Sequence, residues 1–232
     1  MRKIILLPVG SIEEHGVLPL DTDTLIAQAF CVLVARKLQA DVQPPISEGF
    51  CPTTCKLSGT KTFRFLEVYQ TIANRLQELM AQDQKYIILV NIHGGNEAVL
   101  TALVQDFYQE NPCPLFYFNP YTAFADELDA LFFSDRDNSF KECSLLHASL
   151  EILGMAQFPG PEVDEEMGRD SLTERLKKMG VLGFSYREPP QHIAWRAGAT
   201  AQNGNQFLEA VADRFVPVSK DFQEYVESEL EK

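Results

Sequence analysis

Two polar clusters in the chain contain residue types that bind divalent metal ions. The first lies in the segment GSIEEHGVLPLDTD and includes Glu13, His15 and Asp23; the second lies in NIHGGNE and includes His93. Carboxylate oxygens together with imidazole nitrogens suit an ion such as Zn²⁺, Mn²⁺ or Fe²⁺. Glu13 and His15 are two positions apart, so in an extended segment they share one face and can reach one ion or two adjacent ions.

Each of these residues also has a simpler interpretation. Glu14 and Asp21 are most simply solvated loop carboxylates, and Asp23 could serve only as a helix N-cap. A single histidine such as His93 is more often a buried, hydrogen-bonded residue than a ligand. However, the chain has only four histidines, and three of them fall in or beside such clusters, which favours the metal interpretation.

The third of these histidines, His147, lies in the helical-looking segment ECSLLHASLEILGM. His147 and Glu151 are four positions apart and would be neighbours on one helix face. They could form an acid–base or ligand pair that faces the site, or an ordinary surface contact, and the spacing does not decide between the two. His192 has no such polar company and is interpreted as structural or as part of a rim.

The elements that must position these residues alternate between strands and helices. Continuous apolar runs predict buried parallel strands in KIILLPVG, KYIILVNIHGGN and CPLFYFNPY. Helical spacing follows in DTLIAQAFCVLVARKLQA, FRFLEVYQTIANRLQELMAQD and EAVLTALVQDFYQEN, and the C-terminal segment from 198 is predicted helical except around Pro217. The segment 125–142 is harder to assign, and the acidic segment 159–178 is expected to be a surface excursion. The alternation predicts an α/β fold with a mainly parallel sheet, in which both polar clusters follow carboxyl ends of strands, where ligands bind.

Composition narrows the class of protein. The 232 residues are expected to form a single domain, 1–232, with 45% hydrophobic residues for the core. The net charge of −13 argues against nucleic acid or an anionic membrane as partner. With neither a signal peptide nor a span of apolar residues, the protein is expected to be cytoplasmic. The five cysteines are expected to be reduced, with Cys51 and Cys55 as ordinary loop residues rather than a metal or redox pair.

The motifs as a set resemble those of the creatininase family of metal-dependent amidohydrolases. LPVGSIEEHGVLPLDTDT at 7–24 is similar to the family pattern PVGS-x-E-x-HG-x-HLPL-x-TD, and NIHGGN at 91–96 is close to N-x-HGGN. Weaker similarities are SGT at 58–60, HASLE at 147–151 and ATAQNG at 199–204. The resemblance extends from residue 4 to about residue 212, in the family's order.

The resemblance implies a three-layer α/β/α sandwich, two divalent metal ions and often a hexameric assembly. By position, Glu13 and His93 would each help to hold one ion, His15 would hold its neighbour, and Asp23 would bridge both. His147 would carry a proton to the leaving nitrogen, and Glu151 would be the acid that follows it in the motif HA-xxx-E, as ligand or catalytic group.

Two departures from the family pattern are visible. HGVLPL lacks the second histidine that usually follows HG. Glu151 comes four residues after His147 rather than five, and the usual Thr-Ser after the acid is absent, so its equivalence is open. One residue is about 100° of rotation on an ideal helix.

The expected function is metal-dependent hydrolysis of a non-peptide C–N bond, in a cyclic amide or a formamide, by a homo-oligomer that takes a small-molecule amide. Peptide trimming is equally compatible with the motifs. The alternative is a catalytically impaired family member that binds metal and serves as a scaffold.

Overall fold

A parallel β-sheet forms the centre of the computed structural model, which describes residues 3–111, 113–168, 171–180, 183–189 and 192–230. The strands are β1 (Ile5–Val9), β2 (Asp41–Val42), β3 (Ile87–Asn91) and β4 (Phe116–Phe118), in the order β2-β1-β3-β4. β1 pairs with β3 along its whole length, from Ile5 opposite Ile87 to Val9 opposite Asn91. The two polar segments therefore leave neighbouring strands at the same sheet edge.

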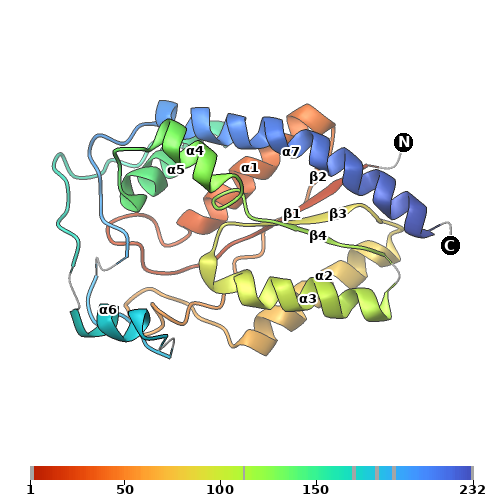
Figure 1. Cartoon of the computed structure of the whole chain (residues 1–232), viewed down its shortest axis with the longest axis horizontal. Helices are drawn as coiled ribbons and strands as arrows, with labels where there is room; N and C mark the ends of the chain where they lie inside the picture. The colour runs from red at the N-terminus through yellow and green to blue at the C-terminus, as the bar shows by residue number, and fades with distance from the viewer. Residues whose placement is uncertain (1–2, 112, 169–170, 181–182, 190–191, 231–232) are drawn as a thin grey trace.

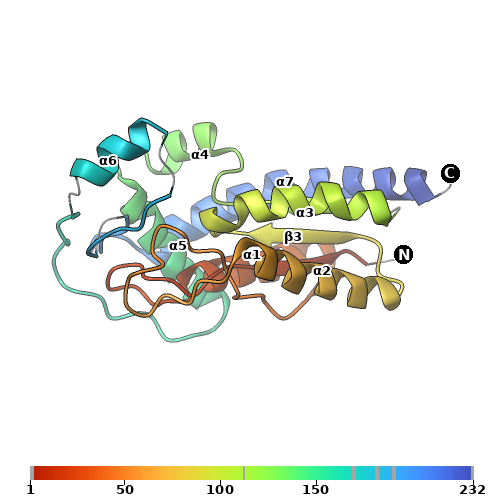
Figure 2. The ribbon, with the colours of Figure 1, turned by 90° about the horizontal axis from the view of Figure 1, so that it is seen from below.

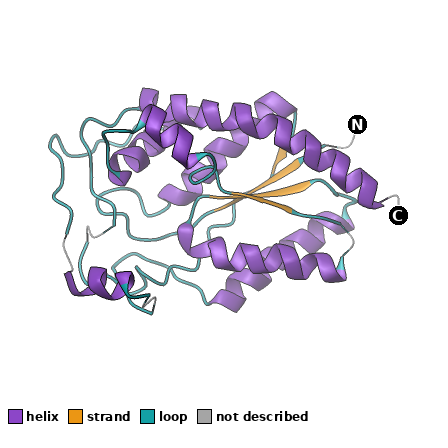
Figure 3. Ribbon diagram, in the orientation of Figure 1, coloured by secondary structure: helices purple, strands orange, loops and turns teal. Residues whose placement is uncertain are grey.

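Helices cover both faces of this sheet, which confirms the predicted three-layer α/β/α architecture (Figures 1 and 3). One face carries α1 (Thr22–Leu38), α4 (Ala125–Phe132), α5 (Asn138–Ile152) and α7 (Ala201–Leu230). The other carries α2 (Phe65–Ala81) and α3 (Glu97–Glu110). Side chains of β1 alternate between the two cores: Leu6 joins the first, and Ile5 and Leu7 join the second, as the two-residue period of a strand requires.

The two remaining elements lie on the side of the molecule toward which the carboxyl ends of the strands point. A short 3-10 helix, η1 (Gly94–Asn96), connects β3 to α3, and α6 (Ser171–Lys178) lies well beyond the sheet (Figure 2). Of the segment 159–178, residues 159–168 are mostly exposed, which agrees with the expected surface excursion, residues 169–170 lie outside the described part of the chain, and Ser171–Lys178 forms α6. Among the described residues, no helix is both long enough and apolar enough to cross a membrane.

The predicted interruption at Pro217 is wrong, because α7 continues through it to Leu230. A proline inside a helix removes one backbone hydrogen bond and crowds the preceding turn. Here the helix is held from both sides of that position, since Phe215 and Val226 are fully buried in the first core. Tertiary packing therefore outweighs the local preference of proline.

Candidate metal centre

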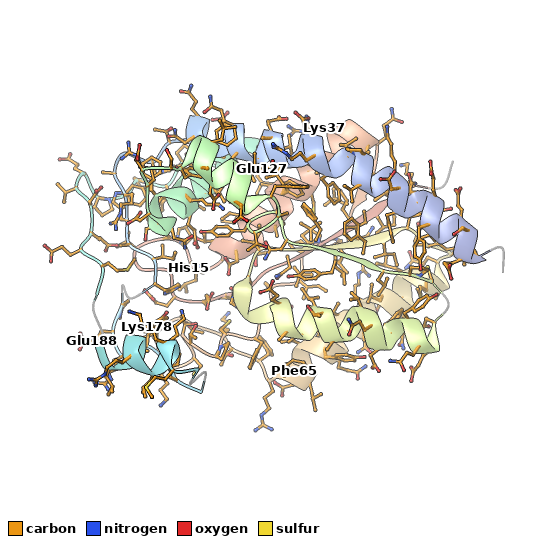
Figure 4. The ribbon with its side chains drawn as sticks, viewed as in Figure 1. His15, Lys37, Phe65, Glu127, Lys178 and Glu188 are labelled. Carbon is orange, nitrogen blue, oxygen red and sulfur yellow. The ribbon has the colours of Figure 1, made fainter. Side chains whose placement is uncertain are left out.

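Four of the sequence-predicted residues come together beyond the carboxyl ends of β1 and β3. His93 Nδ1 lies 2.9 Å from both Glu13 Oε1 and Asp23 Oδ2. His15 Nε2 lies 3.4 Å from Asp23 Oδ1, and Figure 4 shows His15 past the end of the sheet. Each of these four residues is at most 6% exposed. The structure thus assembles one buried cluster from two segments of the chain, in which Asp23 and His93 are 70 residues apart.

A fifth residue, Glu142, completes this cluster from the first turns of α5. Its Oε1 lies 3.2 Å from His15 Nε2, and the residue is 7% exposed. The sequence interpretation did not single out Glu142. Three buried carboxylates and two imidazoles thus meet in one place, a set that is costly to bury unless positive charge lies among the carboxylates.

Asp23 occupies the centre of the cluster. Its Oδ1 faces His15 and its Oδ2 faces His93, so the carboxylate reaches both halves of the site. α1 begins at Thr22, with Asp21 at the cap position, and Asp23 lies in the first turn. The N-terminal end of a helix favours a carboxylate there, and the Ser11 hydroxyl donates a hydrogen bond of 2.9 Å to Asp23 Oδ2.

Backbone carbonyls orient both histidine rings. His15 Nδ1 lies 2.9 Å from the carbonyl oxygen of Glu13, and His93 Nε2 lies 2.9 Å from that of Phe50. When these nitrogens donate their N–H, the opposite nitrogen of each ring has a free lone pair that faces the carboxylates. A ligating histidine is typically held in this way by an acceptor on its other nitrogen.

The HGGN segment has a clear local role in this arrangement. A Cβ on Gly95 would lie 2.0 Å from the Phe50 carbonyl oxygen and 2.5 Å from His93 Nε2, so only glycine leaves room for that hydrogen bond. Asn96 donates to the carbonyl of Gly10 and accepts from the N–H of Phe50, each at 2.9 Å. Asn96 therefore fastens the loop after β1 to the loop that contains Phe50.

The charges of the cluster shift the pKa values of its members. Burial alone lowers the pKa of His15, but the charge of Asp23 and hydrogen bonds to Asp23 and Glu142 outweigh it and raise the pKa well above the ordinary value. The pKa of His93 is raised in the same way, against burial, chiefly by Glu13 and Asp23. Burial raises the pKa of Asp23, yet His15 and His93 bring it well below its ordinary value. Protons on the histidines thus compensate the carboxylates when no other cation is present.

Two further residues, Cys51 and His192, border the cluster. Ligand atoms of Glu13, Cys51 and His93 lie within 4.8 Å of one another, as do those of Glu13, His15 and His192. Cys51 is buried and Cys55 is exposed, both as free thiols. Cys51, which was expected to be an ordinary loop residue, therefore lies beside the cluster, whereas Cys55 is exposed.

Burial overturns the expectation for Glu14, which was interpreted as a solvated loop carboxylate. Glu14 is 5% exposed, and its Oε1 accepts a hydrogen bond from the N–H of Gly16. Its Oε2 is buried without a hydrogen-bond partner. Burial raises the pKa of Glu14.

The structure does not bring His147 and Glu151 into the cluster. His147 Nδ1 lies 2.8 Å from Gln157 Oε1, and its ring contacts Trp195 edge-on. Glu151 is exposed and accepts a hydrogen bond of 3.2 Å from Asn205 Nδ2. The reason is helical phase, since nine residues at about 100° each place Glu151 about 180° around α5 from Glu142.

The family spacing itself indicates Glu142. Cys143 and Ser144 follow Glu142, which is closer to the usual Thr-Ser than the Ile-Leu after Glu151. Five residues before Glu142, where the motif HA-xxx-E has its histidine, the chain has Asp137. Asp137 caps α5 through the N–H of Phe140 and forms a salt bridge with Arg196.

Comparison with known proteins identifies the family. The family model for creatininase (creatinine amidohydrolase) matches residues 1–218. A mycofactocin precursor peptide peptidase of Mycolicibacterium smegmatis is 38% identical over 119 residues, 45% of this chain and 44% of that protein. Its counterpart in Mycobacterium tuberculosis is 33% identical over 110 residues, 43% of this chain and 44% of that protein. The chain thus matches less than half the length of these relatives.

Solved structures show the same fold. Creatinine amidohydrolase (creatininase) superimposes with a TM-score of 0.70 at 15% identity, over 97% of this chain and 90% of that one. A creatininase described with Mn gives a TM-score of 0.68 at 15% identity, over 97% and 91%. A creatininase variant of Zn–Zn type gives 0.69 at 15% identity, over the same shares. The family match over most of the chain, together with the assembled cluster, shows that this protein belongs to the creatininase family.

Proposed function

We propose that this protein is a metal-dependent amidohydrolase with two divalent ions, Zn²⁺, Mn²⁺ or Fe²⁺, in the buried cluster. Glu13 and His93 would hold one ion, His15 and Glu142 the other, and Asp23 both. The observation that carries the proposal is the division of the Asp23 carboxylate, with one oxygen toward each histidine. Neither His147 nor Glu151 has a role in this proposal.

The donor set fits such a centre. His15 Nδ1 and His93 Nε2 are hydrogen-bonded to the backbone carbonyls of Glu13 and Phe50. The other nitrogen of each ring therefore faces the carboxylates and is free to bind an ion. Glu13 Oε2 accepts a hydrogen bond of 2.6 Å from the Thr54 hydroxyl, which leaves Oε1 for the ion. Two cations close together repel each other unless anionic ligands lie between them, and Asp23 supplies that charge.

The chain's own residues prepare the site for hydrolysis. Bound divalent ions would lower the pKa of water toward neutrality and polarise the amide carbonyl. Asp23 would set the distance between the two ions. The hydrogen bonds from His15 and His93 to backbone carbonyls would keep their ligand nitrogens in place. Burial of the cluster excludes bulk water, which strengthens every electrostatic interaction inside.

The substrate class we propose is a small amide, with the expected cyclic amide or formamide first. Creatininases and mycofactocin precursor peptide peptidases differ in the amide that their names imply, so a short peptide belongs in the same test. Turnover of cyclic amides, formamides and short peptides should be measured on metal-loaded protein, after chelation, and after metal is restored. Turnover that disappears on chelation and returns with metal is expected, whereas turnover unaffected by complete metal removal would contradict the proposal.

A second candidate function is metal binding without turnover. It is favoured by one observation: where the family motif has a histidine on α5, this chain has Asp137 in a salt bridge with Arg196. The same panel separates the two functions, because a scaffold would bind two ions and hydrolyse none of the amides.

Assembly into a homo-oligomer, as a hexamer, is proposed from the family resemblance. Light scattering at micromolar concentration should give a mass several times the 26.1 kDa of the chain. A monomer at that concentration would contradict it.

A further inference from the structure

His192 has two buried ring nitrogens without a hydrogen-bond partner. Within the described part of the chain, the other buried side-chain atom in this state is Glu14 Oε2. A buried polar group that lacks a partner costs free energy, so native proteins rarely leave one unexplained. The sequence interpretation of His192 as a structural or rim residue does not account for this.

The ring of His192 is held firmly against the cluster. It stacks on Tyr186, with an interplanar angle of 6° and centroids 5.7 Å apart. It also contacts the His15 ring, at a centroid distance of 5.4 Å. Two residues further on, the N–H of Ala194 donates a hydrogen bond of 3.0 Å to the Ser139 hydroxyl, on the helix that carries Glu142. The segment is thus anchored next to one wall of the cluster.

The position of His192 suits metal ligation. A ring nitrogen of His192 lies within 4.8 Å of ligand atoms of both Glu13 and His15, which is close to the span of about 4.2 Å that one ion with bonds of about 2.1 Å can join. A neutral imidazole has the free lone pair that a metal ion requires.

We propose that His192 is a further ligand of the ion that His15 holds, supplied by the segment that follows α6 rather than by the loops after the strands. This inference rests on the proposed metal centre. It accounts for the unpartnered nitrogen that faces the cluster, and the stacking on Tyr186 accounts for the fixed ring. The ion that His15 holds thereby gains a second imidazole ligand, and imidazole is a softer ligand than carboxylate.

The test is a pair of matched truncations, His192→Ala and His147→Ala, which each remove one imidazole. Chelated wild-type protein and both variants should be titrated with Co²⁺ by calorimetry, and the visible absorption of bound Co²⁺ recorded, because that spectrum responds to the ligands of the ion. We expect His192→Ala to weaken one of the two ions by at least about 10-fold, the lower end of what even outer-sphere partners contribute, and to change the spectrum. His147→Ala should match the wild type in both readouts.

A second variant, His192→Phe, keeps the ring stacking but has no nitrogen, and it replaces His192→Ala if that variant does not fold. Unchanged affinities and spectrum for two bound ions in the His192 variant would overturn this inference and leave the proposed function intact. Absence of Co²⁺ binding in the wild type would overturn the proposed function itself.

Discussion

At the scale of single residues, the choice of Glu142 over Glu151 is open to a direct test. Glu142 lies 3.2 Å from His15 Nε2 in the buried cluster, whereas Glu151 is exposed on the other side of the same helix. Glu142→Gln keeps the shape but removes the charge, so it should reduce the affinity for one metal ion by about 10-fold or more, as loss of a charged partner in a buried site implies. Glu151→Gln is the matched control and should leave both affinities unchanged, as measured by calorimetry. Equal effects of the two variants would refute the assignment of Glu142.

Four of the five residues in the cluster could be predicted from the sequence because they lie in the segments that follow apolar strands, three in loops and Asp23 at the start of α1. Glu13, His15, Asp23 and His93 follow β1 and β3, and paired parallel strands bring such loops together. Glu142 could not be found in this way, because it lies within α5 and not in a segment that directly follows a strand. Glu142 can be identified only when it is known which face of α5 points toward the cluster. The four-residue spacing of His147 and Glu151 drew attention to the opposite face of that helix.

At the scale of elements, the contact of α5 with α7 depends on one glycine. A Cβ on Gly204 would lie 2.1 Å from the carbonyl oxygen of Ser144 and 2.8 Å from the Cβ of Ala148. Glycine to alanine inside a helix usually stabilises a protein by about 1 kcal/mol. Here the clash should reverse the sign, and Gly204→Ala should lower the free energy of unfolding by about 1–3 kcal/mol.

Urea denaturation gives this free energy, with Gly183→Ala as control because a Cβ there meets nothing within 4 Å. Since α5 carries Glu142, the Gly204 variant should also weaken metal binding. A Gly204→Ala protein as stable as the wild type would show that α5 and α7 are not packed as closely as the structure has them.

Element prediction succeeded where local pattern and tertiary packing agree. The apolar runs predicted β1, β3 and β4, and the helical spacing predicted α1, α2 and α3. The two-residue β2 is too short to leave a pattern, and α4 lies in the segment that the pattern left unassigned. α7 passes through Pro217 because burial of its neighbours decides the outcome, and this is not visible in local sequence.

At the scale of the whole molecule, the buried cluster couples stability to pH. The pKa values of His15 and His93 in the folded protein lie above the ordinary value of 6.5. In metal-free protein their stabilisation is therefore complete below about pH 6.5 and is lost as the pH rises through the raised pKa values. The pKa of Asp23 is lowered, so its contribution persists at neutral pH and is lost only in acid.

In the proposed metal centre, a bound ion would take the place of those protons. The difference in Tm between metal-loaded and metal-free protein should therefore increase as the pH rises from about 6 to about 8. Thermal unfolding at several pH values measures it, and Asp23→Ala should show a much smaller and flatter difference. A difference that is constant or decreases with pH would contradict this linkage.

The central claim is that one carboxylate, Asp23, serves two metal ions. The measurement is the metal content and affinity of wild type, Asp23→Ala and the loop control Asp21→Ala, by titration of chelated protein with Zn²⁺ followed by elemental analysis. Asp21 is exposed at the cap of α1, so its variant should bind two ions as the wild type does. Loss of both ions together in Asp23→Ala is the result that a bridging carboxylate predicts. Two tightly bound ions in Asp23→Ala would contradict the account.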